Sequence, residues 1–592
     1  MRSVTRERLD ALVQLDGGRW LALTDPARIV EARTIEGVRP AIAEVERLTR
    51  DAGYHAAGFL SYEAGAAFGL STRPPRETDV PLVWFALFEP SHARELDALG
   101  PAGAYDLGAL APSLDRTAFD AAFQRIKGHL ADGDTYQVNF TFRISGFFAG
   151  DPRGLFADLV DAQQGRFAAF LDIGSHAICS ASPELFFALD GMDVSSRPMK
   201  GTAKRGPTAA EDRRRRDDLQ VSPKQRAENV MIVDMVRNDL GRIAEVGSVH
   251  VPELFAVEPY PNVWQMTSLV TARSRASLEE IVAAMHPSAS VTGAPKVRTM
   301  ELLNGLEPEP RGVYTGAIGH VFPDGNARFN VAIRTAVVNR ELGRVDFGVG
   351  SGIVWDSDPA AEYDECLLKG SVLGQRPTAF ELLETTLWTP DGGFLLLERH
   401  LERLRASAEY FGFAYSLDAV RAALDHAVAG PAAPQRVRVL LARDGAVRVE
   451  RQALSPAPSA SSPAPLRVGL AASPIDPDDP FVFHKTTNRA HYDRARIAGL
   501  DDVILWNPMG EITEATTANV VVELTPGDRV TPPIACGLLA GTCRAEALAE
   551  GWMREAVVTI DQLRASRAIW LLNSVYERRE AVLRDGSVNE TR

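Results

Sequence analysis

The chain has 592 residues, which exceeds what one hydrophobic core supports, so we expect two or more domains. The composition is ordinary for a globular protein, and the net charge of −14 argues against a nucleic-acid partner. No apolar run reaches the roughly 18 residues that cross a bilayer, the N-terminus has no apolar stretch of signal-peptide length, and the cysteines show no metal-like spacing. We therefore expect a cytoplasmic enzyme without disulfide bonds, a membrane segment or bound nucleic acid.

The first three-fifths of the chain alternates strand-like runs with amphipathic helices. The strand-like runs include FRISGFFA, AAFLDI, AICSA and LFFALD, and the Asp-Gly of FPDGN separates two later ones, RGVYTGAIGHVF and ARFNVAIRTAVV. This mixture predicts a large α+β domain built on antiparallel sheets. Within it, the basic run from Arg213 to Arg216 is flanked by acidic residues, which favours a solvated helical face over a binding patch.

The pattern breaks near residues 374–378, where GQRPT is followed at once by the strand-like run AFELLETTLW. We expect a domain boundary there, with 1–374 before it, divided into an N-terminal region 1–110 and a core 111–374, and with 379–592 after it. The second part opens with a strand, a TPDGG turn and a helix in LLLERHLERLRASAEYFGF, whose apolar residues recur at helical spacing. The later Pro/Ser/Ala stretch LSPAPSASSPAP predicts an irregular surface loop.

Two helical segments of the first part carry carboxylates in noteworthy positions. In AENVMIVDMVRNDLGRI, Glu228 begins the apolar stripe that Ile232 and Val236 continue. A carboxylate there is costly unless a positive group meets it, and either an arginine salt bridge or a metal ion would serve. In DPAAEYDECLLKG, Glu362 and Glu365 share one helical face, where a hard divalent cation with oxygen ligands would relieve their repulsion.

Two glycine-containing segments of the first part predict turns. FGVGSGIV holds Gly348, Gly350 and Gly352, whose missing side chains would let backbone N–H groups approach an anion closely, although a plain tight turn fits the same residues. SRPMKGTAKRG places Lys200 after a strand-like run, in a turn bounded by proline and glycine. A turn lysine is usually solvated and idle, whereas one in a low-dielectric cleft loses its proton more easily and becomes a nucleophile.

Several segments of the first part, taken in their order, resemble a known family. They are SASPELFF, RPMKGTAKRG, AENVMIVDMVRNDLGRI, HPSASVTGAPKVRTMELL, RGVYTGAIGHV, FNVAIRTA and GSGIVWDSDPAAEYDE, within roughly residues 50–372. The series resembles the chorismate-utilising enzymes, which include anthranilate synthase, aminodeoxychorismate synthase component I and isochorismate synthase. At the lysine of PMKGT the sequence resembles the aminodeoxychorismate synthases, which carry lysine there, whereas anthranilate synthases carry alanine at that position.

The resemblance implies amination of chorismate at a metal-assisted site. Glu228 and Glu365, with Glu362 close by or water-linked, would hold Mg²⁺ against the ring carboxylate of the substrate. Lys200 would attack C2 and expel the C4 hydroxyl while Glu184 donates a proton, and ammonia would then enter at C4 and release the lysine. This chemistry needs a neutral amine and a protonated acid in one site, and desolvation shifts both groups in that direction.

The resemblance also implies the substrate contacts and the source of ammonia. Arg334 and the backbone around Gly350 and Gly352 would bind carboxylate oxygens, a role that suits the planar guanidinium fork. His286 and Thr292 would line the same substrate site, although a satisfied structural histidine is the simpler interpretation of His286. The chain shows no glutaminase signature, so the family implies that ammonia comes from a separate glutamine amidotransferase subunit.

The second part holds the groups that pyridoxal phosphate requires: a lysine for its aldehyde, an acid for its ring nitrogen and donors for its phosphate. The candidates are Lys485 in FVFHKTTNRAHYD, Glu514 in GEITEATTANVVV and the turn LLAGTCRAEAL. In that turn Thr542 and Cys543 open a predicted helix, whose exposed N–H groups favour a phosphate. Arg403 of HLERLRASA would supply the matching charge. Each residue alone is ordinary, since a loop lysine is usually solvated and a Gly-Thr helix start is usually a cap.

Their order resembles the two-lobed fold-type IV pyridoxal enzymes, over roughly residues 379–585, a group that includes branched-chain and D-amino-acid aminotransferases and aminodeoxychorismate lyase. The resemblance implies that Lys485 holds the cofactor, that Glu514 pairs with its ring nitrogen, and that Arg403 with the Thr542 and Cys543 amides holds the phosphate. Two departures stand out: the usual opening strand with its Asp-Arg-Gly turn is absent, and the phosphate turn has GTCR in place of Gly-Ile-Thr-Arg.

Together the two parts predict synthesis of the folate precursor 4-aminobenzoate. The first part would make 4-amino-4-deoxychorismate, and fusion to such a synthase favours a lyase, which eliminates pyruvate, over an aminotransferase. One alternative is an anthranilate synthase component fused to an amino-acid aminotransferase, which Lys200 opposes. Another is a cofactor-free C-terminal module, which Lys485 and Glu514 oppose.

Overall fold

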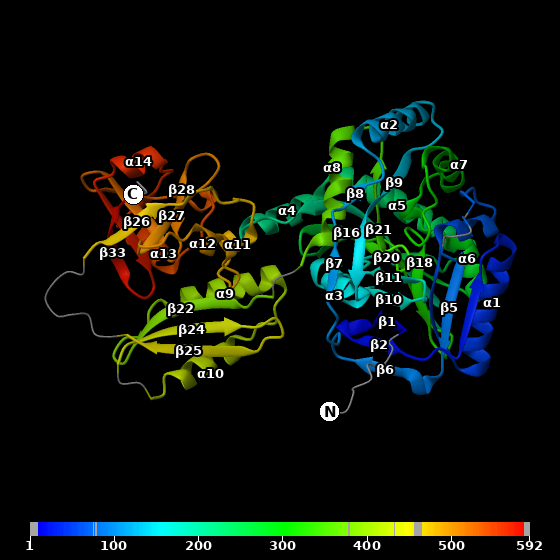
Figure 1. The fold of residues 1–592 in the computed structure, drawn as a ribbon, viewed down its shortest axis with the longest axis horizontal. Helices are drawn as coiled ribbons and strands as arrows, with labels where there is room; N and C mark the ends of the chain where they lie inside the picture. The colour runs from blue at the N-terminus through cyan, green and yellow to red at the C-terminus, as the bar shows by residue number, and fades with distance from the viewer. Residues whose placement is uncertain are drawn as a thin grey trace. The chain divides into compact units, whose positions relative to one another are not determined.

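The computed structural model describes residues 10–74, 76, 80–376, 379–430, 433–454 and 464–584. The chain divides into two compact units (Figure 1), the first formed by Met1–Arg205 and Arg215–Pro377 and the second by Gly206–Arg214 and Thr378–Arg592. Most of the predicted Pro/Ser/Ala loop lies outside the described residues. Within the described ranges, no helix has both the length and the apolar character needed to cross a membrane.

Antiparallel strands form the first unit. In its described residues they make two sheets, and every pairing within them is antiparallel, so the predicted large antiparallel α+β domain is confirmed. The first sheet follows the order β17 (Gly293–Ala294), β9 (Gln137–Gly150), β21 (Arg344–Ile353), β20 (Thr335–Asn339), β11 (His176–Ser180), β10 (Ala169–Asp172), β1 (Ala11–Gln14), β2 (Trp20–Leu23) and β6 (Ala93–Leu96), with β7 (Tyr105–Leu107) and β8 (Ala111–Pro112) beside β9.

The second sheet lies against the first. Its order is β14 (Met199–Lys204), β16 (Val263–Arg273), β13 (Asp193–Arg197), β12 (Leu185–Asp190), β19 (Ala327–Val331), β18 (Ala317–Val321), β4 (His55–Leu60), β5 (Val83–Phe88) and β3 (Arg28–Ala32), with β15 (His250–Pro259) beside β16. A core cluster that includes Leu23 and Leu171 of the first sheet and Phe59 and Phe88 of the second fills the space between them. Alternation along each strand supplies these inward residues.

Helices cover the outer face of each sheet. Apolar residues of α1 (Ile35–Ala52), α5 (Pro223–Gly241) and α6 (Leu278–Met285) pack on the second sheet. Those of α2 (Arg116–Ala131), α3 (Pro152–Gln163), α7 (Lys296–Leu306) and α8 (Pro359–Gly370) pack on the first. The two helices that carry predicted carboxylates begin alike: Ser222 caps α5 and Asp358 caps α8, and a proline follows each cap. The unit therefore has four layers, helix–sheet–sheet–helix.

The segment FGVGSGIV is a strand, so the prediction of a turn there was wrong. Gly348, Gly350 and Gly352 lie in β21, which pairs with β9 without interruption, and none of them has a positive φ. Their spacing of two places them on one face of the strand. A Cβ at Gly348 would meet the ring of Tyr314 at 2.1 Å, and one at Gly350 the carbonyl oxygen of Phe140 at 2.7 Å. The glycines keep this face bare rather than bending the chain.

Lys200 also lies in a strand, β14, and not in the predicted turn. The pairing of β14 with β16 shifts register between Met199 and Thr202, so β14 holds an extra residue there. Gly201 has a φ of 101°, in the region that favours glycine. The glycine therefore forms a bulge that lets the strand continue, and such a bulge re-aims the neighbouring side chain.

Arg311 joins several elements of the first unit from a buried position. Each N–H group of its guanidinium has a partner, and the partners come from separate segments of the chain. They are the Glu307 carboxylate (2.8 and 2.9 Å), the carbonyl oxygens of Val291 (2.8 Å) and Asn139 (2.7 Å), and the Thr315 hydroxyl (3.3 Å). Val291 ends the short helix η4 (Ala289–Val291), and Glu307 follows α7. Arg311 thereby ties η4, β9 and the end of α7 together.

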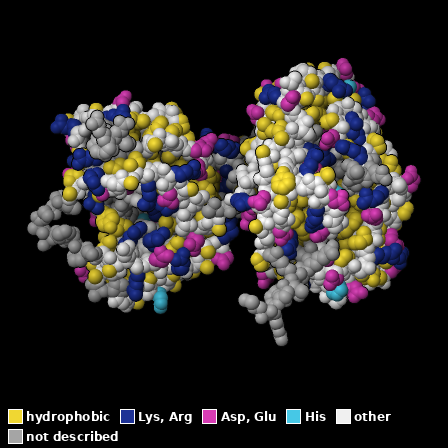
Figure 2. Space-filling model, in the orientation of Figure 1, with side chains coloured by type: hydrophobic (Ala, Val, Ile, Leu, Met, Phe, Trp, Pro, Cys, Tyr) yellow, Lys and Arg dark blue, Asp and Glu magenta, His cyan; other side chains and the backbone are white. Residues whose placement is uncertain are grey.

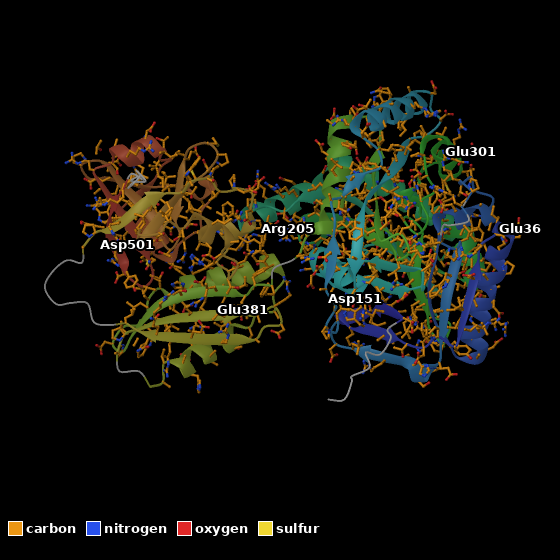
Figure 3. The ribbon with its side chains drawn as sticks, viewed as in Figure 1. Glu36, Asp151, Arg205, Glu301, Glu381 and Asp501 are labelled. Atoms are coloured by element: carbon orange, nitrogen blue, oxygen red, sulfur yellow. The ribbon has the colours of Figure 1, made fainter. Side chains whose placement is uncertain are left out.

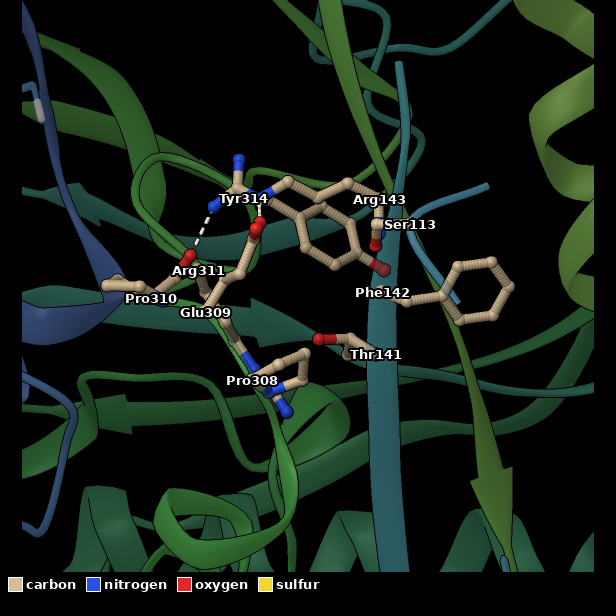
Figure 4. A pocket seen from close by; sticks show the side chains of 9 residues that line it. All are labelled: Ser113, Thr141, Phe142, Arg143, Pro308, Glu309, Pro310, Arg311 and Tyr314. Carbon is tan, nitrogen blue, oxygen red and sulfur yellow. Dashed lines mark hydrogen bonds and ion pairs between the residues drawn. The ribbon is translucent and has the colours of Figure 1, made fainter. Parts of the chain in front are cut away.

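A small pocket opens beside Arg311 (Figure 4). Its volume of about 20 Å³ suits a single water molecule. The Arg143 side chain lines it, and its guanidinium donates to the Pro310 carbonyl oxygen and pairs with Glu309. The Tyr314 side chain completes the wall. Lys200 is not among the described residues that line this pocket.

The second unit has two lobes, as predicted. The first lobe holds the sheet β23 (Gly393–Phe394), β22 (Leu382–Thr389), β24 (Gln435–Leu441) and β25 (Val447–Ala453), covered by α9 (Leu397–Phe411) and α10 (Leu417–Ala427). The second holds β28 (Ile512–Ala515), β27 (Asp502–Trp506), β26 (Leu466–Leu470), β33 (Glu577–Leu583), β32 (Ala568–Asn573), β29 (Asn519–Thr525), β30 (Asp528–Thr531) and β31 (Arg554–Glu555), with α13 (Thr542–Ala549) and α14 (Ile560–Ala565). The shorter helices are α11 (Pro480–Phe483) and α12 (Ala490–Ala495).

The predicted helices of the charged and amphipathic runs are confirmed. The run from Arg213 to Arg216 lies in α4 (Ala209–Val221), where Arg213 and Arg214 are exposed and Arg215 donates to the Arg205 carbonyl oxygen. The apolar stripe of α9 packs its buried Leu404 on β22 and β24. On the face seen in Figure 2, basic and acidic side chains are interspersed over each unit rather than gathered by sign.

Glu307→Gln should lower the free energy of unfolding by about 3 kcal/mol, because it leaves the buried Arg311 guanidinium without its opposite charge. Urea denaturation followed by circular dichroism measures the change. The control is Glu301→Gln on α7 (labelled in Figure 3), whose ion pair with Arg298 is about half exposed, and we expect a change within about 0.5 kcal/mol. Equal losses in the two variants would show that burial of the pair is not what matters.

Candidate active sites

The Lys200 ammonium lies beside Gly352 of β21 and near two amide side chains of β9. It is 2.8 Å from the position that a Cβ on Gly352 would take, and the Asn139 Oδ1 and Gln137 Nε2 atoms lie 2.9 and 3.1 Å from that position. The absence of a side chain on Gly352 therefore makes room for the ammonium. Asn229 of α5 donates to the Lys200 carbonyl oxygen (3.1 Å) and holds this helix against β14.

Burial shifts Lys200 and Glu184 toward their uncharged forms. Burial of the Lys200 side chain lowers its pKa, and the nearby Lys369 ammonium acts in the same direction, against Glu228, Glu184 and Glu365. Burial raises the pKa of Glu184 to about 7, although a Ser290 hydrogen bond and the Lys200 charge oppose it. An amine that loses its proton easily thus faces a carboxyl group that keeps one.

Gln137 is a site residue that the sequence analysis missed. Its side chain is 1% exposed, yet both atoms of its amide lack a hydrogen-bond partner among the described residues. One oxygen of Glu184 is unpartnered in the same sense. Buried polar atoms without partners are uncommon and often belong to functional sites. The available signal was a glutamine at the start of the apolar strand run QVNFTF.

The three predicted metal ligands are not assembled as a group. Glu228 and Glu365 both act on the charge of Lys200, so each carboxylate lies near that lysine, and Glu362 is not among the main influences on it. Glu365 forms an ion pair with Lys369 (2.6 Å). Burial acts to raise the pKa of Glu365, but the Lys369 charge and hydrogen bond lower it. The described residues contain no cluster of three or more His, Cys, Asp or Glu side chains arranged for a metal ion.

Arg334 is connected to the same surroundings through Lys369. Its guanidinium donates to the Lys369 carbonyl oxygen (3.1 Å), and the Lys369 ammonium donates to that of Gly350 (2.9 Å). Burial lowers the pKa of Arg334, while Tyr314 and Glu365 act against this shift. Arg334, Gly350 and Glu365 therefore belong to one linked cluster, with Lys369 as a member that the sequence analysis did not name.

His286 and Thr292 lie on the segment that borders the strand of Asn139. The backbone N–H of Asn139 donates to the Thr292 carbonyl oxygen (2.9 Å), and both residues are buried. His286 Nε2 lies 3.0 Å from the carbonyl oxygen of Ser61, and burial lowers the pKa of the imidazole to about 4. Its Nδ1 has no partner among the described residues. This His286 is a buried, neutral histidine held by the backbone.

The second unit surrounds Lys485 with charged groups. The backbone N–H of Leu383 on β22 donates to the Lys485 carbonyl oxygen (2.9 Å), which fixes the lysine beside the first lobe. Burial lowers the pKa of Lys485 to about 8, Arg403 and Arg489 act in the same direction, and Glu384 and Glu514 act against it. Arg403 and Glu514 are thus both close enough to Lys485 to act on its charge.

Glu514 lies on β28 in a network of donors. Tyr492 Oη and the Leu539 N–H donate to one of its carboxylate oxygens (2.7 and 3.1 Å), and Asn519 Nδ2 lies 3.3 Å from the other. Burial raises the pKa of Glu514 to about 7. A Cβ on Gly541 would lie 1.8 Å from Asn519 Oδ1, so this glycine lets the turn before α13 approach the network.

The start of α13 is open to an anion. Its cap residue is Gly541, which offers no side chain, so the N–H groups of the first turn, including those of Thr542 and Cys543, are not capped locally. Arg403 reaches this turn, since its Nη1 donates to the Ala540 carbonyl oxygen (2.9 Å). The structure therefore places Arg403 beside the turn that leads to Thr542 and Cys543, and their role in holding a phosphate stays a prediction.

Glu384 of β22 is a further member that the sequence analysis missed. It accepts hydrogen bonds from Arg403 Nε and Nη2 (2.8 and 2.6 Å) and lies 2.6 Å from His400 Nδ1. In the sequence, an isolated glutamate in LLETTLW looks like an ordinary residue on the solvent face of a strand.

Comparisons with known proteins agree with this division of the chain. The family model described as chorismate binding enzyme matches residues 13–374, and the model described as amino-transferase class IV matches residues 381–580. Aminodeoxychorismate synthase component 1 of Klebsiella aerogenes is 43% identical over 255 residues, which cover 43% of this chain and 56% of that protein. Anthranilate synthase component 1 1 of Haloarcula marismortui is 40% identical over 260 residues, covering 44% of this chain and 53% of that protein.

The chain thus spans about half the length of these curated relatives. The solved structure of anthranilate synthase component I from Streptococcus pneumoniae TIGR4 covers 63% of this chain and 95% of its own, with a TM-score of 0.54 and 23% identity, and it shows the fold. Because the first family match extends over more than half of the residues, this chain belongs to the chorismate-binding enzyme family and carries in addition a segment that matches the class IV aminotransferases.

Proposed function

We propose that this chain makes 4-aminobenzoate in two consecutive reactions, amination of chorismate by residues 1–374 and elimination of pyruvate by residues 379–592. The observation that carries the proposal is the pair formed by Lys200 and Glu184, whose pKa values move in opposite directions in one environment. The 43% identity to an aminodeoxychorismate synthase component 1 supports it. Lys200 argues against the anthranilate synthase alternative, as the sequence resemblance implies.

In the amination, Lys200 acts as the nucleophile. Its neutral amine attacks C2 of chorismate while the C4 hydroxyl leaves, and Glu184 gives that hydroxyl a proton, so water departs. Ammonia then attacks C4 and the bond between C2 and the lysine breaks. Arg334 and the bare strand face of Gly350 and Gly352 bind the substrate carboxylates, a role consistent with the planar fork of arginine. His286 and Thr292 shape the same site from the neighbouring segment.

Mg²⁺ would be held by Glu228 and Glu365, with Glu362 close by. Carboxylate oxygens are the ligands that this cation prefers, which fits the donor chemistry. The Lys369 ammonium now neutralises Glu365, as a cation would, so metal binding requires Lys369 to move away from that carboxylate. A metal in this position would offset the negative charge of the substrate carboxylate.

We propose that a separate glutamine amidotransferase subunit supplies the ammonia. The name "component 1" of the similar Klebsiella aerogenes protein supports this division of labour.

The class IV aminotransferase match implies pyridoxal phosphate in the second unit, and the residues present fit it. Lys485 has a lowered pKa, Glu514 is available to a ring nitrogen, and the open start of α13 beside Arg403 suits a phosphate. The cofactor, when bound, stabilises negative charge on the carbon that bears the substrate amine. Lys485 takes the proton from that carbon, and loss of the enolpyruvyl group as pyruvate makes the ring aromatic.

Lys200→Ala should lower formation of the para-amino product by at least about a hundredfold, because it removes the nucleophile. Product analysis with chorismate, Mg²⁺ and ammonium gives the measurement, and chorismate binding should persist. Lys204→Ala, an exposed lysine in the same strand, serves as the control and should retain activity. Unchanged para-amination in the Lys200 variant would sink the assignment.

Glu228→Gln and Glu365→Gln should each raise the Mg²⁺ concentration needed for half-maximal amination by about tenfold or more, since the amide keeps the shape but loses the charge. Asp364→Asn is the control, because this exposed residue of α8 points away from Glu362 and Glu365 on the same helix. If the wild-type chain keeps full amination activity after thorough chelation, the metal proposal is wrong.

Lys485→Ala should abolish covalent attachment of the cofactor and halt the pathway after amination. In the wild type, borohydride reduction should fix the cofactor to the peptide FHKTTNR, where mass spectrometry can locate it. The variant should accumulate 4-amino-4-deoxychorismate without releasing pyruvate, while Lys200→Ala should keep the label. Formation of 4-aminobenzoate by the Lys485 variant at the wild-type rate, with no other lyase present, would contradict the proposed role of this unit.

A further inference from the structure

A buried polar chain in the second unit connects the first lobe to the start of α13. Glu384 binds Arg403 through both carboxylate oxygens and lies 2.6 Å from His400 Nδ1. On its other side, His400 Nε2 lies 3.2 Å from Thr542 Oγ1, which in turn contacts the hydroxyl of Ser574. Glu384, His400 and Thr542 are each less than 5% exposed. One carboxylate therefore reaches both Arg403 and, through one imidazole, Thr542.

Arg403 and His400 keep Glu384 ionised. Burial alone would raise its pKa, but Arg403 and His400 outweigh that effect and lower it to about 2. A buried carboxylate is costly unless its oxygens are satisfied, and here each oxygen accepts a short hydrogen bond from a basic side chain. This arrangement fixes the rotamers of Arg403 and His400, which are three apart on one face of α9.

The hydrogen bonds of Arg403 leave some of its N–H groups available at the turn before α13. Three of the five N–H groups of Arg403 have partners in the described residues, two on Glu384 and one on the Ala540 carbonyl oxygen. The remaining two lie on the terminal nitrogens of the guanidinium. Thr542, which His400 holds from behind, is the first residue of the uncapped helix. Both Arg403 and Thr542 are therefore oriented by groups that lie deeper in the protein.

We infer that Glu384 and His400 are positioning residues that present Arg403 and Thr542 to the phosphate group of the cofactor, so that the site selects the phosphorylated cofactor over its unphosphorylated form. The inference rests on the proposed pyridoxal phosphate function of this unit. If Glu384 served only to hold β22 against α9, its two hydrogen bonds with Arg403 would be enough, and His400 would not be needed. His400 also contacts Thr542, which lies on a helix of the second lobe, and this contact connects the buried polar residues to the anion site.

Glu384→Gln and His400→Asn test the two links of this chain. The first removes the charge that holds Arg403, and the second keeps a donor near Glu384 but loses the Nε2 contact with Thr542. Dissociation constants are measured on the full-length apo chain by absorbance and fluorescence titration, once with pyridoxal phosphate and once with pyridoxal. We expect each variant to bind pyridoxal phosphate about tenfold or more weakly, with pyridoxal affinity nearly unchanged.

Glu398→Gln, on the same helix as His400, is the matched control, because it breaks an exposed ion pair with Arg421 of α10 and should leave both affinities unchanged. Inorganic phosphate should compete with pyridoxal phosphate for the wild type and do so less well for the variants. Equal weakening of both ligands, or tighter binding of pyridoxal phosphate, in His400→Asn and Glu384→Gln overturns the inference. Failure of the wild type to bind pyridoxal phosphate at all would instead overturn the proposed cofactor function.

Discussion

The geometry around Lys200 depends on the buried guanidinium of Arg311. Arg311 binds the backbone of Asn139, whose side chain lies beside Lys200, and the backbone of the η4 segment, whose Ser290 hydrogen-bonds Glu184. A buried arginine that loses a partner is strongly destabilising, so these elements adopt the arrangement that satisfies every N–H group. Lys200 and Glu184, the proposed nucleophile and acid, are thus positioned by a residue outside the proposed reacting pair.

Burial has opposite outcomes for three buried carboxyl groups of this chain, Glu184, Glu514 and Glu384. Burial brings the pKa of Glu184 and of Glu514 to about 7, because neither meets enough positive charge to compensate. Glu384 is equally buried, yet two basic partners hold its pKa at about 2. The basic side chains at hydrogen-bond distance therefore decide whether a buried carboxyl group tends to keep its proton or to stay ionised.

The sequence predicted what depends on local pattern. Alternating and helical spacing of apolar residues predicted the antiparallel sheets and α9, which the structure contains. The order of the motifs predicted Lys200 with Glu184 and Lys485 with Glu514. The predicted turns failed because glycines spaced by two, as in β21, also suit a strand whose face must stay bare, and because a bulge at Gly201 keeps β14 intact. Gln137 and Glu384 were missed because only their burial marks them as site residues, and burial arises only when distant segments pack together.

The bare face of β21 also has a genetic consequence. Every single-base missense change in a glycine codon adds a Cβ, and at Gly352 that atom would come within 3 Å of the Lys200 ammonium. At Gly348 it would overlap the ring of Tyr314, so that side chain would have to move. The intervening Val349 and Ser351 point the other way. Null alleles along this strand should consequently fall at every second codon, a periodicity set by the pleat and not by the reaction.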